Sequence, residues 1–280
     1  MKVFISVDME GITGITDPED VLEGGADYAR GRVLMTGDAN AAVLGAFDVG
    51  ATEVLVNDSH WTARNLLIEQ LDPRARMNKG FHRPMCMVQG LDESYDVAVF
   101  VGYHSCAGTE GGVLNHTLLG KEVHNLLLNG EPIGETRLNS LLAGHYGVPV
   151  VFVAGDDAVC REAKGVLGEN LTTFAVKDGI DMFAANCLHP EQAQKGIREG
   201  VAQALRSLGS REPYRIEAPY TFGFEWSTTT IASTCEWIKG VHKPSPRITE
   251  FTTDDLQEAM RVLFAQMLLA LQVGQKAIYS

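Results

Sequence analysis

The chain has 280 residues, of which 45% are hydrophobic and 21% are charged, and its 36 acidic side chains outnumber the 23 basic ones to give a formal net charge of −13. This composition is typical of a folded globular protein, because enough apolar surface can be buried to offset the entropy lost on folding. An acidic surface repels nucleic acids and anionic membranes, so neither is expected as a partner.

The sequence further indicates a cytoplasmic protein. The N-terminal apolar run, residues 3–7, is shorter than the roughly 7–15 residues of a signal-peptide core, and no run approaches the roughly 18 apolar residues of a membrane span. The cysteines are widely spaced and form no C-x-x-C pair, which is typical of reduced thiols in a reducing compartment. They are Cys86, Cys106, Cys160, Cys187 and Cys235, of which Cys106 is left open as an alternative nucleophile.

The first two-thirds of the chain alternates short apolar runs with helix-like segments. This alternation predicts an α/β fold with a mostly parallel sheet flanked by helices. The expected strands are Lys2–Val7, Glu53–Val56, Val97–Gly102, Val148–Ala154 and Thr172–Val176. The expected helices are Tyr28–Phe47, Ile133–His145, Asp157–Val166 and Pro190–Leu208.

A break near residues 208–213 separates this region from a segment whose pattern of expected strands and helices is different. We therefore expect an α/β metal-binding catalytic domain over residues 1–210. A smaller C-terminal α+β lobe over residues 211–280 would then serve packing or oligomerisation.

Within the expected lobe, Tyr214–Ala218 and Thr228–Ala232 predict strands, and Thr249–Phe251 predicts part of another. The last segment has apolar residues at spacings of three and four, which predicts an amphipathic helix. Thr252 and Asp255 resemble a capping box at the start of that helix.

Polar side chains follow four of the expected strands where each strand ends. Asp8 and Glu10 follow the first, His60 the second, His104 the third, and an aspartate pair at 156–157 the fourth. The carboxyl ends of parallel strands meet at one edge of a sheet, so these side chains should converge. Two carboxylates with two imidazoles form a ligand set typical of zinc or a related divalent ion. Each residue alone has a structural explanation, such as a helix N-cap for the first aspartate of the pair, but together they favour a metal site.

A glycine-rich loop, residues 105–112, follows His104 and leads to His116. Its glycines permit close approach to a ligand, and it is not a phosphate loop because no G-K-[ST] follows. The loop allows His116 to return to the same edge. Glu135 lies in a predicted first helical turn, where a carboxylate either stabilises the helix dipole or joins the edge as a further ligand.

Several blocks, in this order along the chain, resemble the zinc-dependent D-aminopeptidases of the dipeptide-operon type. The family signature S-x-D-x-E-G is present as Ser6–Gly11, and further matching blocks are Tyr28–Arg32 with the downstream pair Met35–Thr36, Glu53–His60, Gly102–His104, Gly134–Asn139 and Val153–Asp157. The resemblance is close over about residues 1–190 and looser beyond. Ordered blocks of this kind are more specific than any single motif.

The resemblance implies two Zn²⁺ ions per subunit, with Asp8 as the bridging ligand, and it implies the ligand set Asp8, Glu10, His60, His104 and Glu135. It also implies a catalytic role for His116, as a proton shuttle or an oxyanion-stabilising group. The implied activity is hydrolysis, by metal-activated water, of short peptides with a free N-terminal D-amino acid, such as D-Ala-D-Ala. The implied assembly is a ring-shaped homodecamer. Other divalent ions stay open as the physiological metal.

The alternative is a dinuclear amidase or phosphoesterase acting on another small substrate. A phosphoesterase needs Arg or Lys beside the metals to bind phosphate oxygens. No basic residue follows the strands directly, although Lys121 or Arg137 could reach the edge. A purely structural metal is disfavoured because the donors form an open edge rather than a closed cysteine cage.

Overall fold

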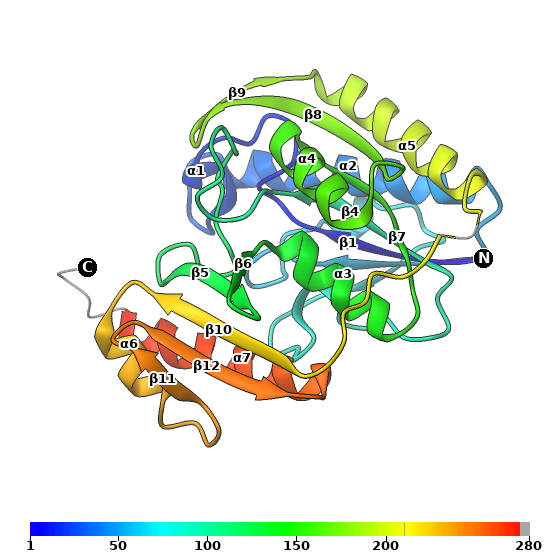
Figure 1. The fold of residues 1–280 in the computed structure, drawn as a ribbon. Helices are drawn as coiled ribbons and strands as arrows, with labels where there is room; N and C mark the ends of the chain where they lie inside the picture. The colour runs from blue at the N-terminus through cyan, green and yellow to red at the C-terminus, as the bar shows by residue number, and fades with distance from the viewer. Residues whose placement is uncertain (210, 275–280) are drawn as a thin grey trace. The chain divides into compact units, whose positions relative to one another are not determined.

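The computed structural model describes residues 1–209 and 211–274, which form two compact units (Figure 1). Among the described residues, the first unit consists of 1–105, 109–115, 136–209 and 211–215, and the second of 106–108, 116–135 and 216–274. The chain therefore passes between the units several times rather than once.

The first unit is built on a seven-stranded sheet with the order β3-β2-β1-β4-β7-β8-β9. Neighbouring strands are parallel except for β9, which returns antiparallel to β8. Every residue of β4 and β7 is buried, as expected for strands covered on both faces. The strands are β1 (Lys2–Val7), β2 (Glu53–Asp58), β3 (Arg76–Asn78), β4 (Val97–Tyr103), β7 (Val150–Asp156), β8 (Thr172–Asp181) and β9 (Ala184–Cys187).

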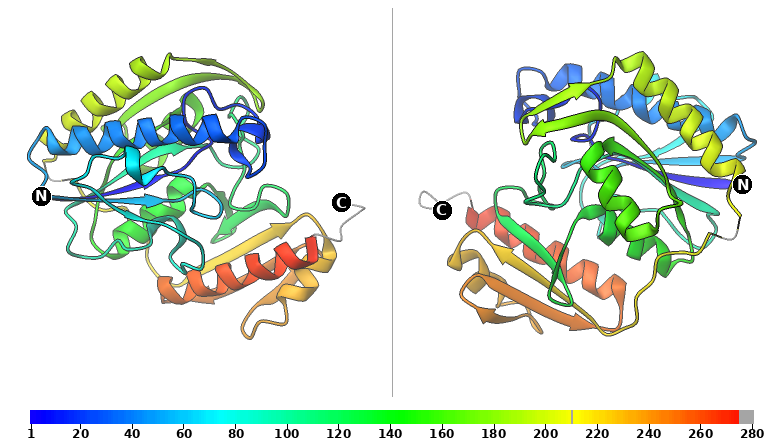
Figure 2. Two further views of the ribbon diagram at one scale, coloured as in Figure 1. Left: turned by 180° about the vertical axis from the view of Figure 1, so that it is seen from behind. Right: turned by 45° about the horizontal axis from the view of Figure 1, so that its top comes forward.

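Helices cover both faces of this sheet (Figures 1 and 2). The long helices α2 (Tyr28–Phe47) and α5 (Pro190–Arg206) pack against each other on one face, and α4 (Asp157–Leu167) packs on β7 and β8 at the other face with α3 (Glu135–His145) nearby. The short helix α1 (Pro18–Val21) contacts α2 and begins with a capping box at Asp17. Two 3₁₀ turns, Ile68–Gln70 and Cys86–Val88, complete the unit.

The second unit is an antiparallel sheet with the order β11-β12-β10-β5-β6, covered on one face by two helices. Its core contains Trp226, whose indole Nε1 donates to Thr249 Oγ1 at 2.8 Å, and Thr249 in turn donates to Gln266 of α7 at 2.7 Å. The strands are β5 (Val123–Leu128), β6 (Glu131–Ile133), β10 (Tyr220–Trp226), β11 (His242–Ser245) and β12 (Ile248–Thr253), and the helices are α6 (Thr229–Cys235) and α7 (Leu256–Gly274).

The predicted α/β class is confirmed, with a mostly parallel sheet flanked by helices and a smaller α+β unit. β1 and α2 have the predicted bounds, and β2, β4, β7 and β8 lie where strands were expected. Residues 116–135 belong to the second unit because β5 pairs with β10, an arrangement the sequence pattern did not indicate.

Two strand predictions in the second unit were wrong. The strand lies at Tyr220–Trp226 rather than at Tyr214–Ala218. The threonine-rich segment Thr228–Ala232 starts helix α6, in which Thr228 is the N-cap and accepts the N–H of Ile231. Capping and burial of the apolar face of α6 against α7 override the strand preference of β-branched residues.

The predicted capping box before α7 was also wrong in detail. Thr252 instead lies in β12 and its hydroxyl hydrogen-bonds to that of Thr221 at 2.9 Å. The cap is formed by Thr253, which accepts the N–H of Asp255, and by Asp255, which accepts the N–H of Gln257. The helix itself, with its apolar face buried, is as expected.

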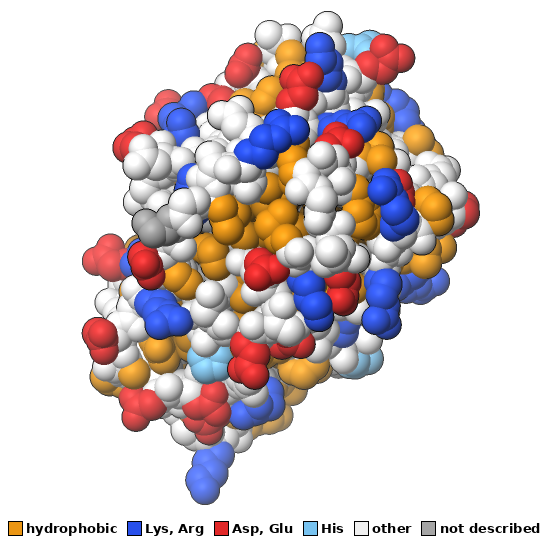
Figure 3. All heavy atoms as spheres, turned by 90° about the vertical axis from the view of Figure 1, so that its right-hand side faces the viewer, with side chains coloured by type: hydrophobic (Ala, Val, Ile, Leu, Met, Phe, Trp, Pro, Cys, Tyr) orange, Lys and Arg blue, Asp and Glu red, His pale blue; other side chains and the backbone are white. Residues whose placement is uncertain are grey.

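The surface of the protein carries charges of both signs. Lysine and arginine side chains are interspersed with acidic and apolar ones on the face drawn in Figure 3. None of the described helices combines the length and apolarity that a membrane crossing requires.

A buried carboxyl group lies within α2. Asp38 is 0% exposed, and burial raises its pKa to about 7, although the backbone of Thr13 and the charge of Lys177 act in the opposite direction. An unfolded chain releases this proton near pH 4. Between about pH 4 and 7 the folded protein therefore holds a proton that the unfolded chain has lost, so this group's contribution to stability falls as the pH rises.

We predict that Asp38→Asn removes this pH dependence. The stability of the variant relative to wild type should rise from pH 5 to pH 7.5 and then level off, with a total gain of at most about 4 kcal/mol. Thermal unfolding of metal-free protein at several pH values measures it. Asp48→Asn is the control: Asp48 is exposed and Arg198 lowers its pKa, so that variant should show no trend in this window. A stability difference for Asp38→Asn that does not change with pH would contradict the prediction.

Candidate metal centre

Four of the predicted site residues converge at the carboxyl edge of the first unit's sheet. β2, β1 and β4 are adjacent, so His60, then Asp8 and Glu10, then His104 follow neighbouring strand ends. All four side chains are buried, with residue exposures of 3% for Asp8, 5% for Glu10, 6% for His60 and 1% for His104. Parallel register alone brings these residues together, as predicted.

The donor atoms of this cluster lie close enough to share cations. His60 Nδ1 lies 3.0 Å from Glu10 Oε2 and 3.4 Å from Asp8 Oδ1. His104 Nε2 lies 3.5 Å from the other oxygen of Asp8, Oδ2. One donor atom from each of Asp8, Glu10 and His60 falls within 4.8 Å of the others, which suits a single divalent ion.

Backbone carbonyls orient both imidazole rings toward the carboxylates. His60 Nε2 is 3.0 Å from the carbonyl oxygen of Val21, and His104 Nδ1 is 3.0 Å from that of Ser105. A carbonyl only accepts, so each of these nitrogens carries a proton. In the neutral ring the opposite nitrogen then directs a lone pair at a carboxylate, which is favourable only with a proton or metal ion between them. Zinc-binding histidines are oriented in this way.

The carboxylates make this cluster attract positive charge. Burial is the largest single influence on His60 and would lower its pKa, but Glu10 and Asp8 together hold the pKa well above its ordinary value. A divalent cation would displace the proton that the cluster otherwise holds.

Two glycines allow the loop after β1 to pass close to the end of β4. A Cβ on Gly11 would lie 1.9 Å from the carbonyl oxygen of Tyr103, and one on Gly102, whose φ is +71°, would lie 2.2 Å from that of Asp8. The approach is secured by backbone hydrogen bonds from Asp8 to Val101 and from Gly11 to Gly102, at 2.9 and 2.8 Å. The last residue of the signature block is therefore glycine for a steric reason.

A buried hydrogen-bond network ties the same strand ends together. Ser6 Oγ lies 2.7 Å from both Ser59 Oγ and Tyr103 Oη, and it donates to the carbonyl of Met87 at 2.8 Å. Asn139 Nδ2 of α3 donates to Tyr103 Oη at 3.2 Å. The three hydroxyl residues each precede a candidate ligand by one or two positions. The sequence pattern did not predict this hydrogen-bond network, although the serine of the signature block, Ser6, is one of its members.

The aspartates at 156 and 157 have structural roles instead. Asp156 is the N-cap of α4, accepting the N–H of Val159, and it also accepts the N–H of Val113, both at 2.7 Å. Asp157 accepts the N–H of Gly179 at 2.8 Å and pairs with Arg161. The N-cap interpretation of Asp156 is therefore confirmed.

The remaining two site residues, Glu135 and His116, belong to the second unit. Glu135 is buried at the start of α3, and its Oε1 accepts the N–H of Leu118 at 2.7 Å. His116 is half-buried, with its side chain next to Gly120. Cys106 accepts a weak hydrogen bond from Thr117 Oγ1 at 3.8 Å. The roles of Glu135 and His116 stay predictions.

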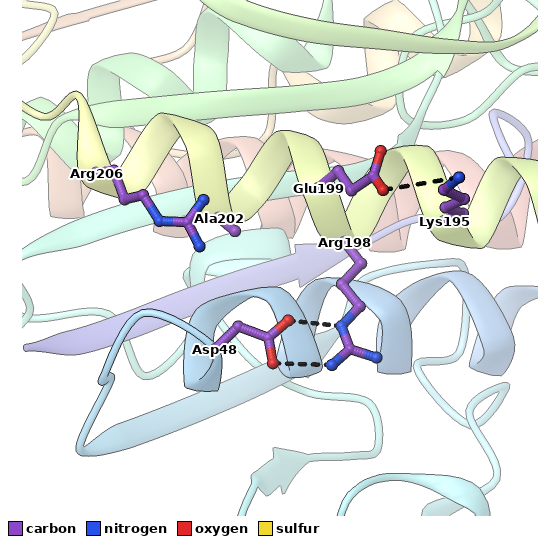
Figure 4. Close-up of a pocket in the computed structure, with 6 residues that line it drawn as sticks. All are labelled: Asp48, Lys195, Arg198, Glu199, Ala202 and Arg206. Atoms are coloured by element: carbon purple, nitrogen blue, oxygen red, sulfur yellow. Dashed lines mark hydrogen bonds and ion pairs between the residues drawn. The ribbon is translucent and has the colours of Figure 1, made fainter.

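A separate surface hollow at α5 contains none of these residues (Figure 4). Arg198 forms two hydrogen bonds with Asp48, at 2.6 and 2.8 Å, and Lys195 pairs with Glu199 at 3.9 Å. These charges compensate each other, and the hollow lacks the buried, converging donors of a catalytic site. Its lining residues are Asp48, Lys195, Arg198, Glu199, Ala202 and Arg206.

Comparison with known proteins agrees with this geometry. The peptidase M55 family model, described as D-aminopeptidase, matches residues 1–265. A D-aminopeptidase from Bacillus subtilis (strain 168) is 38% identical over 275 residues, covering 98% of this chain and 99% of that protein. The solved structure described as Zn-dependent D-aminopeptidase DppA from Bacillus subtilis, a self-compartmentalizing protease, is 37% identical, with a TM-score of 0.93 over 97% of this chain and 98% of that one. The chain thus belongs to the D-aminopeptidase family of hydrolases.

Proposed function

We propose that the protein is a dinuclear zinc aminopeptidase that removes a D-amino acid from the free N-terminus of short peptides such as D-Ala-D-Ala. The observation that carries this proposal is the buried cluster of Asp8, Glu10, His60 and His104, in which each imidazole directs a nitrogen at carboxylate oxygens. The zinc dependence in the description of the solved relative supports the same metal here.

Asp8 is proposed as the ligand that bridges two Zn²⁺ ions. Its two oxygens face different imidazoles, Oδ1 toward His60 and Oδ2 toward His104. Glu10 and His60 would hold one ion, and Glu135 would complete the ligand set with His104. A carboxylate that serves two ions also explains why so much acidic charge is concentrated at one strand end.

Two zinc ions would supply a lowered pKa for bound water and polarisation of the scissile carbonyl. The chain's own residues provide the remaining functions. The carboxylates fix the ions, and the buried setting of Asp8 and Glu10 limits competing water. His116 is proposed to transfer a proton to the leaving amine or to stabilise the oxyanion, because imidazole titrates near neutral pH.

A phosphoesterase would need a basic residue beside the metals, and Lys121 and Arg137 are the candidates that the sequence offers. Arg137 donates to the hydroxyl of Tyr214 at 3.0 Å, and the ammonium of Lys177 donates to three backbone carbonyls. Arg137 is therefore engaged elsewhere, whereas Lys121 is exposed, so comparison of peptide and phosphate-ester substrates decides between the two functions.

We predict that metal-free protein regains D-Ala-D-Ala hydrolysis with two equivalents of Zn²⁺. Asp8→Ala should lose both ions, and His104→Ala should weaken mainly one, because only the first removes a shared ligand. Elemental analysis and turnover on the same preparation measure both effects.

The matched control is His242→Ala, since His242 is an exposed histidine paired with Glu250. L-Ala-L-Ala and p-nitrophenyl phosphate serve as comparison substrates. Full activity at one equivalent of zinc would refute the dinuclear centre, and faster turnover of the phosphate ester would refute the peptidase assignment.

For His116→Ala we predict that both metal ions are retained and that kcat falls by about 10²–10⁴-fold, the usual contribution of a general acid–base group. KM should change little, because a group used only in the transition state adds little to ground-state binding. Loss of metal would make His116 a ligand instead, and a near-wild-type kcat would remove it from the reaction.

We also propose a closed homo-oligomer, with ten subunits as the expected number. The description of the solved relative as self-compartmentalizing supports an assembly, and so do exposed apolar side chains such as Ile180 and Trp237, at 70% and 80% exposure. Light scattering at micromolar concentration should give about ten times the chain mass of 30.4 kDa. A fully active monomer would contradict this prediction.

A cytoplasmic location remains part of the proposal. All five cysteines are free thiols, which suits a reducing compartment.

A further inference from the structure

Lys177, in the middle of β8, is the one lysine or arginine that is fully buried among residues 1–209 and 211–274. Its side chain is 1% exposed, which is rare for an ammonium group unless it is well compensated. The site described above does not include it.

The ammonium of Lys177 is saturated by three backbone carbonyls. Nζ donates to the oxygens of Glu10 at 2.5 Å, Ile12 at 2.9 Å and Ile15 at 2.6 Å. An ammonium has three donors, so its hydrogen-bonding capacity is fully used by the loop that joins β1 to α1. One of the three acceptors is the main chain of a proposed zinc ligand.

Charges around Lys177 favour its protonated form. Burial lowers its pKa to about 8, while Asp156, Cys187, Glu10 and Asp38 act in the opposite direction. The group is therefore mostly cationic at neutral pH.

The same loop has a second, uncharged anchor. Thr13 Oγ1 donates to the carbonyl of Leu188 at 2.6 Å, next to the β9 strand that pairs with β8. Thr13 therefore ties the loop to the same edge of the sheet as Lys177 does, without adding charge.

We propose that Lys177 is a positioning residue for the zinc centre, which gathers the carbonyls of residues 10–15 so that the carboxylate of Glu10 faces His60. This inference rests on the proposed zinc function. Without the ammonium, three buried carbonyls lose their donor and must turn toward water, which displaces the backbone that carries Glu10. The lost positive charge acts in the opposite direction, since it would strengthen cation binding, so the sign of the change in zinc affinity separates the two effects.

The test is the zinc dissociation constant of Lys177→Met, measured by chelator competition on the full-length protein. Outer partners of metal ligands typically contribute 10–100-fold to metal affinity, and a weakening of that size is expected. Lys195→Met is the matched control: Lys195 is exposed and paired with Glu199, and its variant should bind zinc like wild type.

Thr13→Val provides the second variant, should Lys177→Met fail to fold. It removes one loop anchor without altering charge, and a several-fold weakening of zinc binding is expected. Unchanged or tighter zinc binding by Lys177→Met, or by Thr13→Val where only that variant folds, overturns the inference. Absence of zinc binding by wild type would instead overturn the proposed function, so the two failures are distinguishable.

Discussion

The structure depends on the compensation of two carboxylates, Asp8 and Glu10, buried two residues apart at the end of β1. Two such charges in a buried setting repel each other and cost hydration energy unless cations or donors surround them. The described structure surrounds them on several sides: His60 and His104 direct ring nitrogens at the side chains, and Lys177 binds the backbone carbonyl of Glu10. The conformation of the loop after β1 therefore follows from the need to compensate these two carboxylates.

The pairing of the strands brings the two carboxylates and the two imidazoles together in one candidate metal site. Because β2, β1 and β4 are adjacent and parallel, their ends lie side by side without any long excursion of the chain. A shift of one residue in either pairing would turn a candidate ligand to the opposite face of the sheet. The hydroxyl groups of Ser6, Ser59 and Tyr103 oppose such a shift, since they form hydrogen bonds across three strand ends next to the candidate ligands.

Features that depend on one short segment could be predicted from the sequence, whereas features that depend on contacts between distant residues could not. β1 and α2 were predicted with their observed bounds because the residues that favour each element lie within the segment itself. Helix α6 was mistaken for a strand because its stability comes from packing against α7, and the pairing of β5 with β10 joins residues roughly 100 positions apart. The four converging candidate ligands could be predicted because each directly follows the end of a strand. Lys177 was not, because a lysine between Val176 and Asp178 looks like any solvent-facing strand residue.

The chemistry of the buried cation explains why lysine occupies position 177. Three carbonyls converge on one point from residues 10, 12 and 15, and a compact ammonium with three rotating donors can meet all of them. A guanidinium is planar and larger, and its donors suit the flat edge of a carboxylate better than convergent carbonyls. Buried charges of this kind contribute little net stability, and their best-supported benefit is to specify one conformation over others. At this position the conformation specified is that of the loop carrying Glu10, so the energetic cost of burying the ammonium is offset by the correct placement of a proposed zinc ligand.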